Sequence, residues 1–303
     1  MGPLRLLWSV AVGEGLLLAG YALFVEPARL ALTHLVRIDP RVDRPHRLLV
    51  LSDMHLHALS HRTYRRIAHA ARWAAANGAT HALLAGDLLD DDREVELVAG
   101  RLRHALAGLP AVYVSGNHES SRYHRWSVLP EERGIARNDV ARIERAMAEH
   151  DIRRADDRVV EVDGIPLLGI GWRGWRMGPG PLAPRRLADV ARPGLVLAHS
   201  PDHIAGLAPE RVLLALCGHT HGGQVRLPLV GAPWTPVRSR LPRLAGAMSI
   251  AGVATYVGRG IGATVPVRLG SVPEAILLDL RADDPVSIDA TSVVTVRSAR
   301  YRR

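Results

Sequence analysis

The sequence predicts an α/β protein with a largely parallel sheet. From residue 47 onward, short apolar runs with polar ends alternate with segments of helical periodicity, which is the pattern of strand–helix–strand units. Hydrophobic residues make up 48% of the chain and charged residues 23%, a balance typical of globular proteins with a sizeable core. A length of 303 residues suits one large domain, and no low-complexity linker divides residues 47–280.

The N-terminal segment differs from the rest of the chain. Leu6–Val25 is twenty residues long and carries one charge, Glu14. A helix of this length crosses about 30 Å of bilayer core, although a central carboxylate costs on the order of 2.5–3.5 kcal/mol. A cleaved signal peptide is the alternative, but no clean A-x-A site follows. We expect residues 1–30 to form an N-terminal hydrophobic helix that serves as a membrane anchor or signal-anchor.

The elements that follow can be placed in chain order. Residues 31–46 contain two prolines and are interpreted as a linker. Gly78 marks the C-terminal end of the first helix after the linker. The later half is richer in short apolar runs typical of strands, and the tail 281–303 is polar. In the first half we expect strands at 47–53, 80–87 and 111–117 and helices at 61–78, 93–109 and 137–150. In the later half we expect strands near 158–162, 165–170, 194–200, 211–218, 224–228, 254–260 and 274–280.

Charge and cysteine content restrict the class of protein only partly. The formal net charge is +9, and every basic residue is arginine. A basic surface favours phosphate, nucleic acid or acidic lipid headgroups, although a solvated arginine-rich surface explains it equally well. The single cysteine, Cys217, excludes an intrachain disulfide framework and a cysteine-based zinc site. It lies in an apolar run, so we expect it to be a packed small hydrophobe.

Five of the predicted strands carry aspartate, asparagine or histidine at or just after their ends. Because the carboxyl ends of parallel strands meet at one edge of a sheet, these side chains are expected to converge. Alone, each short motif is more often a helix N-cap or a hydrogen-bonded histidine; the joint pattern points to a site. The residues concerned are Asp53 and His55, Asp87 and Asp90, Asn117, His118 and Glu119, His199, and His219 and His221.

The chemistry of this set favours two divalent ions. Oxygen and imidazole ligands without thiolate suit manganese, iron or zinc. The ligands are too many for one tetrahedral ion, and a bridging carboxylate holds two ions about 3.5–4 Å apart. The neighbouring His219 and His221 would then supply one imidazole to each ion.

The ordered set D-x-H, G-D-x-x-D, G-N-H-[DE], H and G-H-x-H, from Asp53 to His221, resembles the calcineurin-like metallophosphoesterase superfamily. The resemblance implies a four-layer α-β-β-α sandwich, with 47–280 as its catalytic domain. It implies two divalent cations, most commonly manganese, with iron or zinc as alternatives, and attack of a metal-bound hydroxide on phosphorus. By the same resemblance, Asp53, His55 and His221 bind the first metal, and Asn117, His199 and His219 bind the second. Asp87 bridges the two metals, and His118 is the catalytic histidine. Asp90 and Glu119 orient the ligands and His118.

Two further stretches resemble one bacterial, membrane-associated branch of that superfamily. They are residues 218–231 and 256–280, and Glu26–Pro27 follows the apolar segment as it does in that branch. The branch includes UDP-2,3-diacylglucosamine diphosphatases of lipid A biosynthesis. The resemblance implies hydrolysis of a phosphodiester or pyrophosphate bond in a lipid-linked substrate, at the bacterial inner membrane. Arginines flank the apolar segment at both ends, so the side of the membrane stays open.

Residues 169–180 depart from the branch, because Trp172, Arg173, Trp175 and Arg176 stand where relatives commonly carry an acidic G-x-D-D segment. These side chains would contact a lipid interface or an anionic headgroup; packing on the sheet edge is an equal alternative. His57 is interpreted as a surface turn residue.

Two other functions remain open at this point. A nuclease or cyclic-nucleotide phosphodiesterase of the same fold is compatible with the basic charge, but we find no recognised nucleic-acid module and expect no nucleic-acid partner. A metal-binding scaffold without catalysis is disfavoured by the complete ligand set with His118. The oligomeric state stays undetermined.

Overall fold

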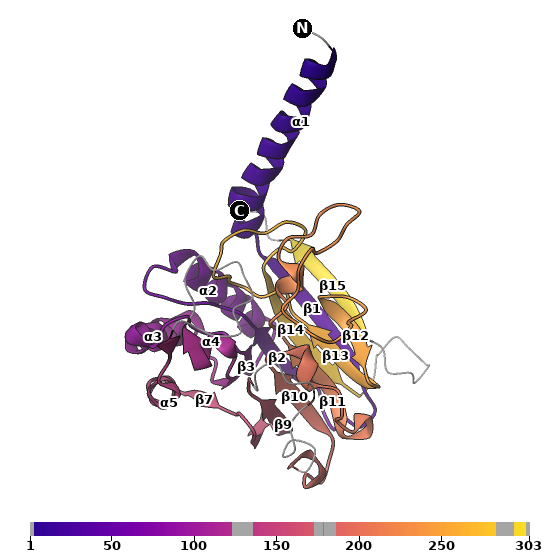
Figure 1. The fold of residues 1–303 in the computed structure, drawn as a ribbon. Helices are drawn as coiled ribbons and strands as arrows, with labels where there is room; N and C mark the ends of the chain where they lie inside the picture. The colour runs from indigo at the N-terminus through magenta and orange to yellow at the C-terminus, as the bar shows by residue number, and fades with distance from the viewer. Residues whose placement is uncertain (1–2, 123–135, 173–177, 179–185, 283–293, 301–303) are drawn as a thin grey trace.

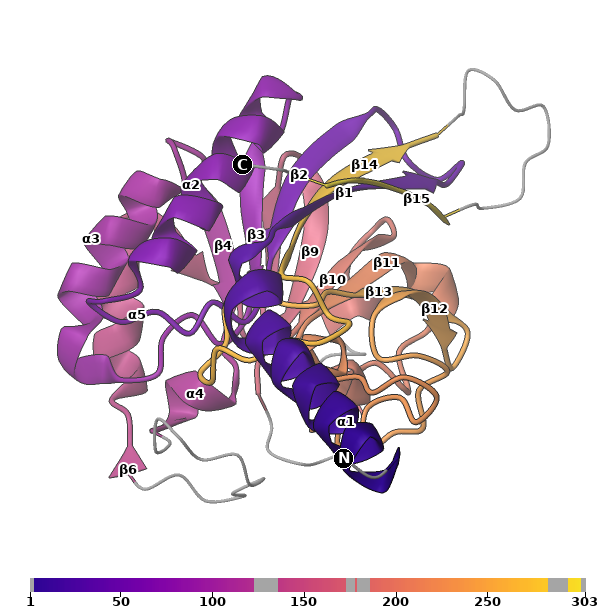
Figure 2. The ribbon, with the colours of Figure 1, turned by 90° about the horizontal axis from the view of Figure 1, so that it is seen from above.

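A computed structural model describes residues 3–122, 136–172, 178, 186–282 and 294–300 (Figure 1). Two β-sheets pack face to face in the body of the molecule, and helix α1 (Pro3–Gly20) projects from one end of it. The view from above in Figure 2 shows the helices α2, α3 and α5 on one side of the sheets.

The first sheet has seven strands in the order β15-β1-β14-β2-β3-β4-β7. Strands β2, β3, β4 and β7 are parallel, whereas β14 runs antiparallel to β2. The bounds of its strands are β1 (Ala31–Ile38), β2 (His46–Leu51), β3 (His81–Ala85), β4 (Ala111–Val114), β7 (Ile152–Arg154), β14 (Glu274–Arg281) and β15 (Val294–Arg300).

Three amphipathic helices cover one face of this sheet: α2 (His61–Ala76), α3 (Val95–Ala105) and α5 (Val140–Ala148). Their buried positions recur at helical spacing, as with Ile67, Ala70, Ala71 and Ala74 in α2, which places one apolar stripe against the strands. Asp139 caps α5 by accepting a hydrogen bond from Arg142 N.

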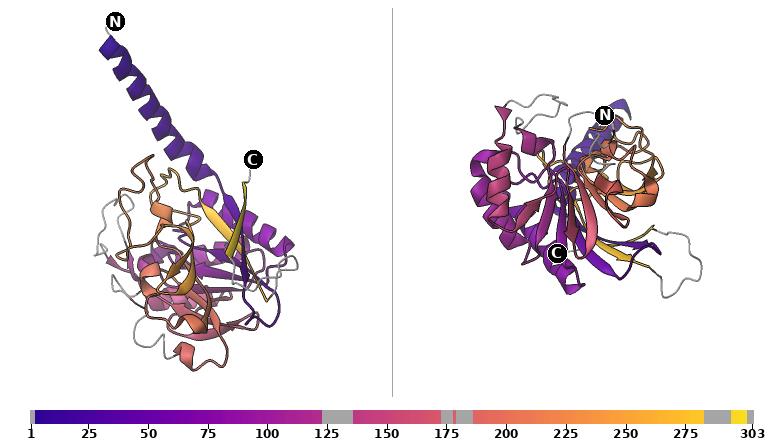
Figure 3. Two further views of the ribbon diagram at one scale, coloured as in Figure 1. Left: turned by 90° about the vertical axis from the view of Figure 1, so that its right-hand side faces the viewer. Right: turned by 90° about the horizontal axis from the view of Figure 1, so that it is seen from below.

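The second sheet has six strands in the order β12-β13-β11-β10-β9-β8. Its inner face packs against the first sheet through an apolar layer that includes Leu48, Leu83, Leu197 and Leu216. The sheets lie between the helices and the loops of the C-terminal half (Figure 3). The bounds are β8 (Val159–Val162), β9 (Ile165–Ile170), β10 (Gly194–Ala198), β11 (Val212–Cys217), β12 (Gly246–Ile250) and β13 (Val253–Val257).

The outer face of the second sheet is covered by shorter elements than the outer face of the first sheet. Leu187, Ile204 and Leu207 pack on it from residues 186–188 and from loops beside the 3-10 turns η4 (Pro201–His203) and η5 (Pro209–Arg211). The α/β class is confirmed. Within the described residues, the fourth layer of the expected sandwich consists of these short elements.

Three segments differ from the sequence-based expectation. Residues 31–38, expected to be linker, form β1 between β14 and β15, and residues 294–300 of the expected tail form β15. These pairings join segments that are at least about 240 residues apart in sequence, so no local sequence pattern reveals them. The expected strand near 224–228 makes only isolated bridges, because a hairpin turn interrupts it.

The N-terminal segment also differs from its prediction. Among the described residues, no helix has both the length and the apolar character that a membrane crossing requires. The α-helix ends at Gly20 and continues as a π-helical turn, η1 (Tyr21–Val25). Ala22 is buried there, and its carbonyl accepts a hydrogen bond from Arg268 N at 2.9 Å. The expected continuous helix Leu6–Val25 thus ends at Gly20 as an α-helix, and Ala22 beyond it packs on the folded domain.

Candidate metal centre

Strand ends of both sheets deliver the predicted site residues to one place. Asp53 and His55 follow β2, Asp87 and Asp90 follow β3, and Asn117 opens the short helix α4 (Asn117–Ser120) after β4. His199 follows β10, and His219 and His221 follow β11. The carboxyl ends of parallel strands in the two facing sheets open at the same edge of the sandwich, which brings these residues together.

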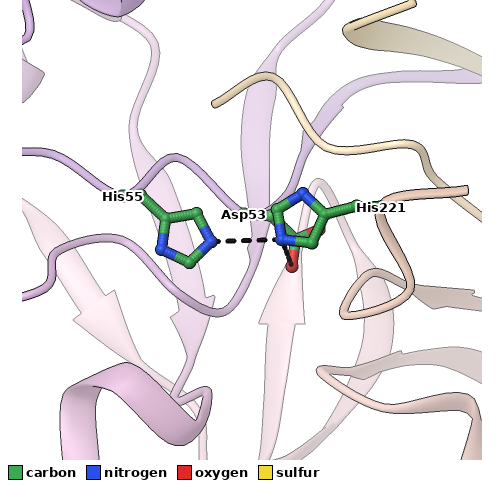
Figure 4. A group of neighbouring side chains, drawn as sticks. All are labelled: Asp53, His55 and His221. Atoms are coloured by element: carbon green, nitrogen blue, oxygen red, sulfur yellow. Dashed lines mark hydrogen bonds and ion pairs between the residues drawn. The ribbon is translucent and has the colours of Figure 1, made fainter. Parts of the chain in front are cut away.

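Asp53, His55 and His221 form one cluster of ligand atoms (Figure 4). The two imidazoles point toward each other, with His55 Nε2 and His221 Nε2 3.2 Å apart. His221 Nε2 lies 3.8 Å from Asp53 Oδ1. Nitrogen and carboxylate atoms that face one point are the donor set a divalent cation requires, so the residues present fit a metal ion.

Asp87, His199 and His219 form a second cluster. His199 Nε2 lies 3.4 Å from Asp87 Oδ2 and 3.1 Å from Asn117 Oδ1. His199 Nδ1 lies 2.9 Å from the carbonyl of Ala85, which as acceptor fixes the proton on Nδ1 and leaves Nε2 for a ligand.

Asp87 lies between the two clusters. Its Oδ2 atom is 3.4 Å from His199 Nε2 and 3.8 Å from His55 Nε2. Its other oxygen, Oδ1, accepts a hydrogen bond from the backbone N–H of His118 at 3.0 Å. One carboxylate therefore lies close to imidazoles of both groups.

The backbone at these positions is unusual. Asp53, His55, Asp87, His219 and His221 all have φ between 47° and 69°, a region that costs non-glycine residues about 1–3 kcal/mol and that clusters at functional sites. Each strand end turns sharply there. Gly86 and Gly116 allow the close approach, because a Cβ at either would lie within 3 Å of His199 or Asp87 atoms.

His118 lies at the edge of the first cluster and shares Asp90 with His55. Asp90 Oδ1 is 2.8 Å from His118 Nδ1 and 2.7 Å from His55 Nδ1. Burial alone would lower the pKa of His118, but the carboxylates of Asp87 and Asp90 outweigh it and raise that pKa to about 9. Without metal, His118 is therefore an imidazolium at neutral pH.

Glu119 supports the loops through backbone contacts. Its carboxylate accepts hydrogen bonds from the backbone N–H groups of Asp87, Leu88, Leu89 and Gly116, at 2.5–3.2 Å. Burial and the charge of Asp87 raise its pKa to about 7 despite these donors. Glu119 thus joins the turn after β3 to the turn after β4.

The two buried aspartates of the clusters differ in electrostatics. Burial opposes the charge of Asp87, but His199, His118 and His55 hold its pKa well below the usual range. Burial, followed by repulsion from Asp87, raises the pKa of Asp53. Burial also lowers the pKa values of His219 and His221 well below normal, which leaves both imidazoles neutral, the form that binds metal.

Three residues near the centre were missed in the sequence. Arg268 is 1% exposed, and its guanidinium donates to His221 Nδ1 at 3.1 Å. Thr264 Oγ1 lies 3.0 Å from His55 Nδ1. Ser271 Oγ donates to the carbonyl of His221 at 2.6 Å. All three lie within the stretch 256–280, whose resemblance to the membrane-associated branch was the available signal.

Trp172 has a different place from either of the alternatives considered. Its ring centre is 5.0 Å from that of His219 and 5.9 Å from that of His199, so it packs over the second cluster. Arg173, Trp175 and Arg176 lie outside the described residues. His57 stays in the turn before α2, where its Nδ1 accepts from Leu59 N, and Cys217 is buried in β11 as expected.

A fold of two facing sheets with a two-cluster, thiolate-free site at the strand ends defines a metallophosphoesterase-type protein. The family model described as calcineurin-like phosphoesterase matches residues 46–223, more than half of the chain. The protein belongs to this family.

Its relatives match over shorter stretches. Phosphodiesterase YaeI of Escherichia coli (strain K12) is 41% identical over 101 residues, which is 33% of this chain and 37% of that protein. The uncharacterized metallophosphoesterase YkuE of Bacillus subtilis (strain 168) is 35% identical over 89 residues, 29% of this chain and 31% of that protein. The match thus spans about a third of the length of these curated relatives.

Among solved structures, a phosphopantetheinyl hydrolase of Mycobacterium tuberculosis aligns over 82% of this chain and all of that one, with a TM-score of 0.41 and 13% identity. An NAD nucleotidase of Haemophilus influenzae aligns over 73% of this chain and 46% of that one, with a TM-score of 0.41 and 12% identity. Similarity of this size does not extend to a substrate.

Proposed function

We propose that this protein is a hydrolase that uses two divalent metal ions, preferentially manganese, to cleave a phosphodiester or pyrophosphate bond. The observation that carries the proposal is the position of Asp87 Oδ2, within 3.8 Å of His55 Nε2 and 3.4 Å of His199 Nε2. A buried carboxylate between two imidazole clusters is suited to bridge two cations. When bound, such cations supply an activated water and neutralise charge on the phosphoryl group.

The ligand roles follow from the clusters. Asp53, His55 and His221 would hold one ion, and Asn117, His199 and His219 the other, with Asp87 shared. The carbonyl of Ala85 orients His199, and Asp90 orients His55. Arg268 lies beside the ring of His221. The acceptors beside Nδ1 of His199 and His55 hold a proton on that atom, which leaves Nε2 of each ring for a ligand.

His118 is proposed as the acid of the reaction. Its imidazole is 12% exposed at the edge of the clusters and is held by Asp90. Asp90 can hold a proton on the ring, and that proton can pass to the leaving-group oxygen as the bond to phosphorus breaks. Asp90 would position His118 and stabilise its charged form.

The substrate is proposed to be a diester or anhydride in a lipid-linked molecule, such as UDP-2,3-diacylglucosamine, at the bacterial inner membrane. The matched Escherichia coli protein is named a phosphodiesterase, which supports the bond type. Seven exposed large apolar side chains between Val12 and Val25 support work at a lipid surface.

One panel of substrates tests this proposal. The full chain is purified, loaded with manganese, and assayed with bis-p-nitrophenyl phosphate, p-nitrophenyl phosphate, cyclic nucleotides, single-stranded DNA and UDP-2,3-diacylglucosamine. We expect turnover of the diester and of the lipid diphosphate. Turnover of the monoester alone would overturn the bond type, turnover of cyclic nucleotides or DNA would favour the alternative enzyme class, and no turnover with two ions bound would favour a scaffold.

A further inference from the structure

A short hairpin follows His221 and places bulky apolar side chains in solvent. Leu227 and Gly231 exchange both backbone hydrogen bonds, at 2.8 and 2.9 Å, around the tip Pro228–Val230. Leu229 is fully exposed, Val230 is 71% exposed, and the nearby Trp234 is 48% exposed. Soluble surfaces seldom gather such side chains at a loop tip without a binding role.

The backbone at the tip of the hairpin is strained in the conformation that exposes these side chains. Leu229 has φ 65°, and Val230 N donates to the Pro228 carbonyl at 2.8 Å across it. This is a γ-turn with positive φ at its centre, a rare and strained conformation. Glycine or asparagine adopts positive φ at less cost. A leucine here costs stability and adds exposed apolar area, so its value must lie in a contact made outside the folded chain.

The hairpin lies beside the base of the N-terminal helix. Arg226 N donates to the carbonyl of Leu269 at 2.7 Å, and Arg268 N donates to the carbonyl of Ala22 at 2.9 Å. Adjacent residues, 268 and 269, therefore connect the hairpin to η1. In Figure 1, orange loops between β11 and β12 reach toward the end of the domain from which α1 projects. Near them, the end of the N-terminal segment exposes Leu23, Phe24 and Val25.

The sequence around the hairpin carries charges of one sign. The sequence from Arg211 to Pro273 contains no aspartate or glutamate. The exposed basic side chains close to the hairpin in sequence are Arg226, Arg238, Arg240 and Arg243. An apolar tip in this basic stretch complements a bilayer with anionic headgroups, where each nearby cation adds about 1 kcal/mol. Asp202 contacts the stretch from outside it, but its carboxylate is buried and accepts from the backbone N–H groups of Arg238 and Ser239.

We propose that Leu229, Val230 and Trp234 insert into the interface of an anionic lipid bilayer, as a second membrane contact beside the N-terminal segment. Because the hairpin begins a few residues after His221, this contact holds the metal centre close to the headgroups. A phosphoester carried by a lipid then reaches the site without leaving the bilayer. The role of this contact in presenting the metal centre to a lipid substrate rests on the proposed function, whereas the binding of the hairpin to the bilayer does not.

The test uses flotation of the metal-loaded full chain with phosphatidylglycerol vesicles and with phosphatidylcholine vesicles. The variant L229N/V230S/W234S removes the apolar tip, and its asparagine suits the positive φ, so the fold is expected to be kept. We expect at least about tenfold weaker partition to phosphatidylglycerol vesicles, from the lost apolar burial. The matched control is Leu97→Ser, which alters an exposed leucine on α3 and should partition like the parent.

Hydrogen–deuterium exchange locates the contact. Phosphatidylglycerol vesicles should slow exchange across residues 224–236 in the parent and not in the variant. Equal partition of parent and variant, unchanged exchange in 224–236, or stronger binding to phosphatidylcholine than to phosphatidylglycerol overturns the proposal. The proposal is also overturned if the parent protein self-associates through the tip while the variant is monomeric and still floats with the vesicles.

Hydrolysis of bis-p-nitrophenyl phosphate in solution separates the two proposals. The variant should hydrolyse this soluble diester at the parent rate, because none of its changed residues belongs to the metal centre. An inactive parent that still binds vesicles through the tip would overturn the proposed function and leave this inference standing.

Discussion

Asp90 Oδ1 lies 2.8 Å from Nδ1 of His118. The same oxygen lies 2.7 Å from Nδ1 of His55, so one carboxylate orients the proposed acid and a proposed metal ligand. The imidazoles of His55 and His118 outweigh the effect of burial and hold the pKa of Asp90 well below its usual range. Asp90 is therefore charged across the working pH range.

Asp90→Asn should lower the pKa of His118. In the unchanged metal-free protein that pKa is about 9, above the ordinary 6.5. The stability that the charged His118 imidazole adds to the folded protein is full below about pH 6.5 and is lost as the pH rises through about 9. Histidine NMR titration of the metal-free proteins measures the shift directly. In the loaded enzyme, the alkaline limb of the pH–rate profile should move to lower pH, with kcat reduced about tenfold or more.

His118→Ala should slow chemistry and leave the metal content at two ions per chain. If His118 protonates the leaving group, the loss should grow with the basicity of that group. We expect a fall of about 10² for an alkyl leaving group and a smaller fall for p-nitrophenolate, measured as kcat with two diesters that differ only there. An equal fall for both leaving groups would contradict the acid role, and full turnover would exclude any catalytic role.

Asp87→Asn should abolish activity and reduce occupancy at both metal positions, because the amide cannot bridge two cations as a carboxylate does. Plasma mass spectrometry after dialysis measures the ions per chain. His221→Ala is the matched comparison, because it removes a ligand from one cluster only. Retention of two ions by the Asp87 variant would show that another group bridges them.

Glu119→Gln should destabilise the fold. The carboxylate is fully buried and accepts from four backbone N–H groups, whereas a glutamine offers one acceptor oxygen and brings two donors. We expect a loss of about 2–4 kcal/mol in the free energy of unfolding, measured by urea denaturation without metal. Glu96→Gln is the control, because Glu96 pairs with Arg142 at the surface, and it should change stability by less than about 1 kcal/mol.

Glu26→Ala should weaken metal binding at the His221 side. Glu26 is 3% exposed and accepts from Ser271 N at 2.5 Å, and Ser271 Oγ in turn donates to the His221 carbonyl. Loss of such an outer contact typically costs about 10–100-fold in metal affinity. A competition titration with a chelator measures it. Glu14→Ala, on the exposed face of α1, should have no effect, and equal affinities for the two variants would break the proposed link.

The sequence alone determined the α/β class, most of the strands and helices and the residues that gather at the site. These features depend on local signals: apolar runs, helical periodicity, and polar residues directly after strands. His219 and His221, for example, are recognisable from one short motif after β11.

The tertiary structure decided what depends on distant pairing. Strand β1 was expected to be linker because its partner, β14, lies about 240 residues away. The same holds for Arg268 beside His221 and for Ala22 under Arg268, since no local pattern places them there. The positive φ of five proposed ligand residues is likewise imposed by packing, because isolated aspartate and histidine prefer other conformations. Long-range contacts supply the free energy that holds these turns, and they exist only in the folded chain.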